Sequence, residues 1–223
     1  MRFTFLASSC ALCCAACSTL TPLEVHDSSV FSPAGRVRVE LDKLHPGLFV
    51  AGSFRDMEGD DVQQLSSTDT LVVEDVTFGA GERLRTSAQL RVGEFVVGKR
   101  ADVEGAELAF YGGLQHVLMD LEVRGFNESK SLDRDSRSLL LGVELSVPSD
   151  SWIAFDMRAD MSYSLSGDEL AMRSVQDGLG LRPMPFTHLF AGWYVRDIEQ
   201  VIDAGSDLDL LFSGPALELG LEF

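Results

Sequence analysis

The chain has 223 residues, of which 18 are basic and 35 acidic, so its net charge is −17. This length suits one large all-β domain or two small domains. The charge excludes nucleic acid as a partner, because no excess of cations is present to neutralise phosphates. No apolar run reaches the roughly 18 residues of a membrane-spanning helix, so none is expected.

The first seventeen residues contain all four cysteines: Cys10, Cys13, Cys14 and Cys17. One cation, Arg2, precedes an apolar segment that runs to Ala16. This order is typical of a secretory signal peptide. We therefore expect residues 1–16 to be a signal peptide.

The residues around Cys17 resemble a bacterial lipobox, in which small residues precede a cysteine that becomes acylated. Ala15 and Ala16 match, while Cys14 stands where leucine is usual. The resemblance implies lipidation of Cys17, and Ser18 in the next position implies delivery to the outer membrane of a Gram-negative bacterium. Ordinary signal cleavage near Ala16 is the alternative.

Residues 18–35 are rich in Ser, Thr and Pro and show no periodicity. We expect 17–35 to be a lipidated N-terminus and flexible tether. After Gly35 the period of the apolar residues is two, which predicts β-strands over 36–223.

The N-terminal half of this region contains five candidate strands, but their phases are mixed. Glu74 shares a face with Val72 and Val76, and Glu94 shares a face with Val92 and Val96. An acid facing lipid would be costly, so we expect a bulge or change of phase there. Asp177, between Val175 and Leu179, raises the same problem.

The C-terminal half alternates more regularly. Residues 153–165 place Ile153, Phe155 and Met157 on one face and Asp156, Arg158 and Asp160 on the other. Residues 139–147, 117–125 and 189–197 follow the same pattern. At about 3.3 Å per residue, the longest of these strands is long enough to cross a bilayer at a tilt.

The connections alternate in expected length. Short links are expected near 115–116, 148–150 and 182–185, and longer polar ones at 127–137, 166–169 and 199–207. Outer-membrane barrels have short periplasmic turns and longer external loops. The acid-rich stretches 56–61, 127–135 and 203–209 suggest cation-bridged contact with lipopolysaccharide at the rim.

The last residues, 215–223, alternate between Leu217, Leu219, Leu221 and Phe223 on one face and small or acidic residues on the other. A terminal strand that ends in Phe resembles the assembly signal of Gram-negative outer-membrane barrels. The resemblance implies recognition by the barrel-assembly machinery and a C-terminus at the periplasmic interface.

Together these features predict a closed, antiparallel, up-and-down transmembrane β-barrel of 8 to 10 strands, similar to the outer-membrane protein A barrel. An even number of strands would place both termini at the same end. The alternative is a periplasmic lipoprotein with a soluble, lipocalin-like barrel that binds an apolar ligand.

The polar faces of the strands are expected to fill the lumen with a network of ion pairs and hydrogen bonds, formed by Glu144, Asp156, Arg158, Asp160, Arg196 and Glu218. Such a barrel would be a monomer with a structural, surface-interacting or narrow-channel (porin-like) role. We expect no catalysis, cofactor or metal, and as partners outer-membrane lipid and lipopolysaccharide. A lipid-modifying enzyme that uses Asp156 or His188 is a further alternative.

Overall fold

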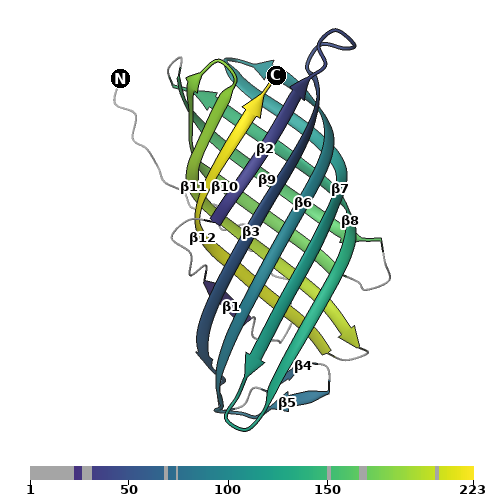
Figure 1. Ribbon diagram of the computed structural model, residues 1–223, viewed down its shortest axis with the longest axis vertical. Coiled ribbons are helices and arrows are strands. Elements are labelled where there is room, and N and C mark those ends of the chain that lie inside the picture. The colour runs from purple at the N-terminus through teal and green to yellow at the C-terminus, as the bar shows by residue number, and fades with distance from the viewer. Residues whose placement is uncertain are drawn as a thin grey trace.

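The computed structural model describes residues 23–26, 32–67, 70–73, 75–149, 152–165, 170–203 and 206–223, with the backbone alone for 23–26, 32, 201–203 and 206–208. These residues form an all-β structure without helices (Figure 1). None of them belongs to a helix long and apolar enough to span a membrane.

Nine strands close into a barrel: β2 (Ser32–Glu40), β3 (Leu48–Gln64), β6 (Arg83–Val103), β7 (Ala106–Arg124), β8 (Ser129–Pro148), β9 (Ile153–Ser164), β10 (Leu170–Met184), β11 (Thr187–Asp203) and β12 (Ser206–Glu222). Consecutive members pair antiparallel, and β12 closes the barrel against β2. The strand count lies within the predicted range of 8 to 10.

The closing pair is parallel, which corrects the predicted up-and-down antiparallel arrangement. Ala216–Glu222 of β12 run beside Ser32–Arg38 of β2 in the same direction. β2 begins beside Ala216, partway along β12, and runs toward the end that carries Phe223, so it does not start at that end. The expectation that both termini lie at one end is therefore wrong.

Further strands lie outside this closed set. β1 (Leu23–His26) pairs parallel with β12 at Leu210–Ser213, so the stretch expected to be a tether contributes β1 and the start of β2. β4 (Leu71–Val73) and β5 (Val76–Phe78) form a small hairpin at the end of the barrel away from Phe223 (Figure 1). We call this end distal and the end with Phe223 proximal.

The proximal end is closed by tight connections whose sequences explain their geometry. Glu104 and Gly105 join β6 to β7 with φ of 52° and 86°. Two consecutive positive φ angles make the primed turn that matches the twist of a hairpin. Gly47, with φ of 73°, accepts the Arg100 N–H through its carbonyl oxygen at 2.7 Å, and a Cβ there would meet the Arg100 carbonyl oxygen at 2.2 Å.

The strands are longer than the sequence predicted. β7 runs through Gln115 and His116 without a turn, and β8 and β11 include most of 127–137 and 199–207, where longer links were expected. The predicted sorting of short and long links is therefore wrong in these places. The acid-rich residues 56–61 likewise lie inside β3 rather than in a loop.

Candidate functional site

The face of the strands that is apolar changes along the barrel axis, from the inner face in the distal part to the outer face in the proximal part. In β6, the inward residues Leu84, Ala88 and Leu90 are buried, while Arg85 and Arg91 face outward. Beyond Val92 the same alternation continues, but the inward residue is Glu94 and the outward ones are Phe95 and Val97. The register of β6 against β7 stays continuous, so no bulge or change of phase occurs, contrary to our expectation for Glu94.

The distal part of the barrel has an apolar interior. Strand β7 contributes Val117, Met119, Leu121 and Val123 to this core, which β12 extends with Leu210 and Phe212. The β4–β5 hairpin caps it with buried Val73 and Phe78. The prediction that the apolar residues of 117–125 face outward, as those of 139–147 and 153–165 do, is wrong: they point inward.

The proximal part is apolar on the outside instead. Exposed apolar side chains follow one another around all nine strands and form what we call the apolar belt: Val37, Val39, Phe54, Phe95, Val97, Phe110, Leu114, Leu139, Leu141, Val147, Phe155, Met157, Met161, Tyr163, Val175, Leu179, Trp193, Val195, Leu217, Leu219, Leu221 and Phe223. An apolar surface that encircles the molecule exceeds the isolated patches of soluble monomers and marks a site of membrane or protein contact.

The height of the belt follows from strand geometry. In β9 it extends from Ile153 to Tyr163, both of which face outward. At about 3.3 Å per residue and a tilt of roughly 40°, this span is about 25 Å high. A band of roughly that height is what outer-membrane barrels present to lipid.

Aromatic side chains lie near both margins of the belt. At the proximal margin the rings of Phe186 and Phe223 stack with centroids 6.1 Å apart, and Trp152 is also exposed. Toward the distal margin Tyr163 and Trp193 face outward. Tyr194, the next residue, points inward and is buried.

Four residues of the expected assembly signal, Leu217, Leu219, Leu221 and Phe223, face outward in the belt. Their strand is held by β2 to its last residue. The Phe223 N–H donates to the Arg38 carbonyl oxygen at 2.9 Å, and the Glu40 N–H donates to the Phe223 carbonyl oxygen at 2.7 Å. The C-terminal part of this strand, from Ala216 onward, therefore has no free edge.

Inside the belt the lumen contains ion pairs, and Glu94 accepts bonds from several strands. Its carboxylate lies 2.6 Å from Nη2 of Arg158 and 3.8 Å from Nη2 of Arg196. Ser53 donates to it at 2.6 Å and Gln115 at 3.1 Å. The Glu94 side chain is 6% exposed, so its charge is compensated almost entirely by protein groups.

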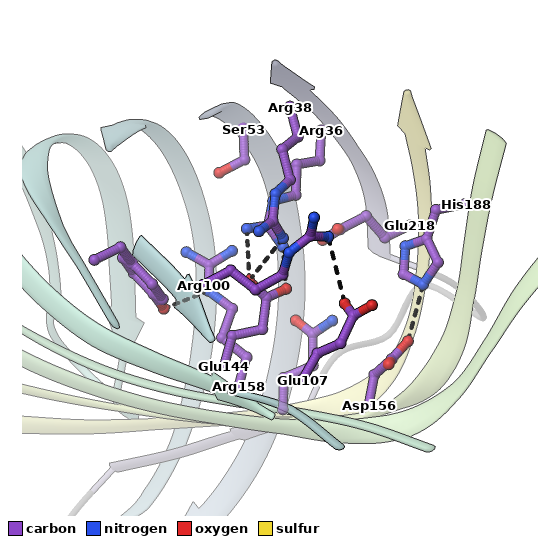
Figure 2. A network of polar contacts seen from close by, with 12 residues as sticks. Arg36, Arg38, Ser53, Arg100, Glu107, Glu144, Asp156, Arg158, His188 and Glu218 are labelled. Atoms are coloured by element: carbon purple, nitrogen blue, oxygen red, sulfur yellow. Dashed lines mark hydrogen bonds and ion pairs between the residues drawn. The ribbon is translucent and has the colours of Figure 1, made fainter. Parts of the chain in front are cut away.

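A second group surrounds Glu144 on β8 (Figure 2). Arg36 binds this carboxylate with both terminal nitrogens, at 2.5 and 3.0 Å, and Arg38 lies 3.6 Å away. Bidentate pairing of this kind fixes the orientation of both groups. Since Arg36 and Arg38 belong to β2, the pair links the closing strand to the opposite wall.

Arg158 also binds Tyr111 and Asp160. Its Nε donates to the Tyr111 hydroxyl at 2.8 Å and lies 3.3 Å from Asp160. The Tyr111 ring lies over Gly142, where a Cβ would come within 2.3 Å of the ring. Gly142 thus makes room for the tyrosine that orients Arg158.

Glu218 and Asp156 complete the predicted set. Arg55 donates to Glu218 at 3.1 Å and to Gln176 at 2.6 Å. Asp156 lies 2.8 Å from Nε2 of His188 (Figure 2). The neighbouring lumen hydroxyls of Ser53 and Ser174 bind the carboxylates of Glu94 and Asp160 and are therefore already engaged.

The structure thus places Glu144, Asp156, Arg158, Asp160, Arg196 and Glu218 together in the lumen. Sequence reasoning missed Arg36, Arg38, Arg55, Glu94 and Tyr111. Glu94 was visible as an acid between two valines, but it was interpreted as a defect in an apolar face. Cys17 and the expected signal peptide lie outside the described residues.

Two cavities lie in this network, each with a volume of about 20 Å³. That volume holds about one water molecule. The side chains therefore fill the lumen at these levels, and neither cavity admits a larger solute. Within the described ranges, no group of three or more His, Cys, Asp or Glu side chains is arranged to hold a metal ion.

Comparison with known proteins finds no matching family model, no matching curated protein and no matching solved structure. The function is therefore inferred from the outer surface of the barrel and from its lumen.

Proposed function

We propose that the protein is an outer-membrane β-barrel of a Gram-negative bacterium, whose apolar belt lies in the hydrocarbon layer and whose distal part projects from the membrane. The observation that carries this proposal is the inversion within single strands. Apart from Asp177, which faces outward between Val175 and Leu179, the outward residues are mainly apolar in the belt and mainly polar or charged beyond it, whereas the inward residues change in the opposite sense.

Closure of the sheet supports the same assignment. A strand edge is intolerable in hydrocarbon, because each unpaired backbone group costs several kcal/mol there. The parallel β2–β12 pair removes that edge at the level of the belt. The belt height of about 25 Å also fits the outer membrane.

We propose that the proximal end faces the periplasm and the distal part faces the cell exterior. The resemblance of the terminal strand to an assembly signal supports this orientation, as do the tight turns at the proximal end. The strand β2 enters the belt from the distal side, and β1 pairs with the distal residues Leu210–Ser213 of β12. Lipidation of Cys17 remains a prediction.

The role that fits this arrangement is structural and surface-interacting. Ion pairs fill the lumen, and cavities of about 20 Å³ are too small for hydrated ions to pass. The distal part, with its packed apolar interior, is a rigid surface for contacts outside the membrane. We propose neither conduction nor catalysis for the barrel.

A pair of substitutions in β8 tests the proposal. Leu141 and Ser131 both face outward, but Leu141 lies in the belt and Ser131 in the distal part. Leu141→Arg is expected to destabilise the folded barrel by about 2–4 kcal/mol, because the charge would enter hydrocarbon. Ser131→Arg is expected to change stability by less than about 0.5 kcal/mol. Denaturant unfolding in phospholipid vesicles measures both.

Extraction provides the control for location. The wild-type protein and Cys17→Ser are both expected to require detergent and to migrate differently on gels with and without boiling. A soluble lipocalin-like barrel would be released from Cys17→Ser without detergent, and Leu141→Arg would leave it as stable as the wild type. Either result would contradict the proposal.

A further inference from the structure

The distal margin of the apolar belt carries basic residues on four of its strands. On β8 the outward residue next to Leu139 is Arg137, and on β7 the one next to Leu114 is His116. On β10 Arg173 is the next outward residue from Val175 in the distal direction. On β6 Arg91 lies two outward positions from Phe95 in the same direction.

Three of these cations already have carboxylate partners. Arg91 lies 3.0 Å from Asp120, and Nε2 of His116 lies 2.6 Å from Asp135. Arg173 lies 3.3 Å from Glu199. These pairs are exposed and on the distal side of the belt, where they face water.

Arg137 differs from the others. Its side chain is exposed and makes no ion pair or side-chain hydrogen bond within the part of the chain that the structure describes. Its backbone carbonyl oxygen accepts the Leu165 N–H at 2.7 Å. His116 is its direct neighbour across the β7–β8 pair, so the two Cβ atoms are about 5 Å apart.

The surroundings of Arg137 indicate what it binds. Leu139, the next outward residue, pairs with Tyr163 on β9, and both side chains are exposed in the belt. Arg137 is one outward position distal to this aliphatic and aromatic surface, so its guanidinium would lie at the depth of lipid headgroups. The planar N–H donors of a guanidinium match two oxygens of a phosphate.

We propose that Arg137 binds the phosphate of a lipid headgroup in the leaflet at the distal margin. The inference rests on the proposed function, since it requires the belt to lie in a membrane. It adds a defined site for one lipid. It also implies that the membrane leaflet at the distal margin is the one rich in phosphate groups.

Native mass spectrometry of the protein in detergent micelles tests the site, with diphosphoryl lipid A as the probe. Phosphatidylcholine, which carries no net charge, is the comparison lipid, and inorganic phosphate is the competitor. The variant is Arg137→Gln, with Arg137→Lys to retain the charge. The matched control is Arg85→Gln, because Arg85 is another outward arginine, 68% exposed, far from the belt on β6.

Wild-type protein is expected to bind lipid A at least tenfold more tightly than phosphatidylcholine. Loss of one headgroup contact in Arg137→Gln should weaken binding by about fivefold, Arg137→Lys by less, and Arg85→Gln by less than about twofold. Equal binding by wild type and Arg137→Gln, or by lipid A and phosphatidylcholine, would overturn the inference. Full competition by inorganic phosphate at the concentration of the lipid would reduce the site to a free-anion site and also overturn it.

Failure of the site and failure of the proposed function are distinguishable. If the barrel needs detergent and remains heat-modifiable but shows no preference for lipid A, only the site is wrong. If the protein is soluble without detergent, the underlying membrane assignment fails.

Discussion

The proximal and distal parts of the barrel are built from the same strands but have opposite cross-sections. Distally, β7 points Met119 and Leu121 inward and Asp120 and Glu122 outward, as in a water-soluble barrel. Proximally, the same strand points Tyr111 inward and Phe110 outward. The backbone alternation is identical, so the difference lies entirely in which side chains the two sets of positions carry.

The comparison teaches that the surroundings, rather than the strand, decide which face is apolar. In water the apolar side must be enclosed, since burying apolar surface stabilises the fold by about 25 cal/mol per Å². In hydrocarbon that gain disappears on the outside, and the lumen is left to polar groups that satisfy one another. The change of pattern near Val92 and Gln115 thus marks the proposed distal limit of the membrane.

The largest expected contrast is in the accessibility of the two ends to a membrane-impermeant maleimide on intact cells. In a Cys17→Ser background, Ser131→Cys lies in the distal part and is expected to label completely. Asp102→Cys lies at the proximal end and should label only after the outer membrane is permeabilised. Labelling of both in dissolved cells is the control. Labelling of the Asp102→Cys variant alone in intact cells would reverse the proposed orientation.

Removal of one partner of an ion pair should reduce the free energy of unfolding far more in the lumen than on the outer surface of the distal part. Glu94→Ala leaves the side chains of Arg158 and Arg196 without their shared carboxylate and is expected to reduce the free energy of unfolding by about 3–5 kcal/mol. Asp120→Ala removes an exposed partner of Arg91 and should cost less than about 1 kcal/mol. Denaturant unfolding in vesicles compares the two, and equal losses would argue against a dry lumen.

The same apolar truncation should have different effects on opposite sides of the wall. Leu90 is fully buried in the distal core, so Leu90→Ala is expected to cost about 3 kcal/mol through lost contacts and the cavity that it leaves. Leu141 is 64% exposed in the belt, and Leu141→Ala should cost about 1 kcal/mol or less, because lipid fills the space. A larger loss for Leu141 than for Leu90 would contradict this account.

The smallest expected effect concerns the acidic outer surface of the distal part. Partial burial and the neighbouring Asp197 and Glu199 raise the pKa of Asp209 to about 6. The folded state thus binds this proton more tightly than the unfolded state, and stability is expected to fall as the pH rises from about 4 to about 6.

Asp209→Asn removes that titration. After allowance for solvent screening, the variant is expected to be more stable than the wild type by about 0.5 kcal/mol at pH 7 and equally stable at pH 4. Unfolding curves at both pH values measure the difference. A variant that is less stable at pH 7 would show that Asp209 has a favourable partner in the folded state.

The sequence predicted most of the proximal part, since its strands follow a simple rule. In 139–147 and 153–165 the apolar residues were assigned to one face and the charged residues to the other, and the structure has the same division. Leu219 and Glu218 likewise lie on opposite faces of β12. These strands lie almost entirely within the belt, so a single pattern describes each.

The distal part was misinterpreted because alternation does not reveal which face is enclosed. Val117, Met119 and Leu121 alternate with charged residues as regularly as the belt strands do, yet they point inward. The polar pair Gln115 and His116, where the pattern inverts, was interpreted as a turn. A test for inversion along each strand would have detected both features.

The parallel pairing that closes the barrel could not be predicted from any local sequence pattern. Pairing of β2 with β12 joins residues more than 180 positions apart, and nothing in Ser32–Glu40 specifies the direction of its partner. The lumen contacts of Arg36 and Arg38 depend on that closure, so they could not be predicted either. Glu94 was the exception, because an acid that breaks an apolar face is a visible signal of a buried ion pair.

The most direct test of the central claim places one tryptophan on each side of the inversion. The two native tryptophans, Trp152 and Trp193, are first replaced by Phe. Leu141→Trp and Ser131→Trp are then compared in vesicles for fluorescence quenching by brominated acyl chains and by aqueous iodide. We predict that bromine quenches the tryptophan at 141 several-fold more than that at 131, and that iodide does the reverse. Equal quenching of both by iodide would contradict the assignment of the apolar belt to lipid.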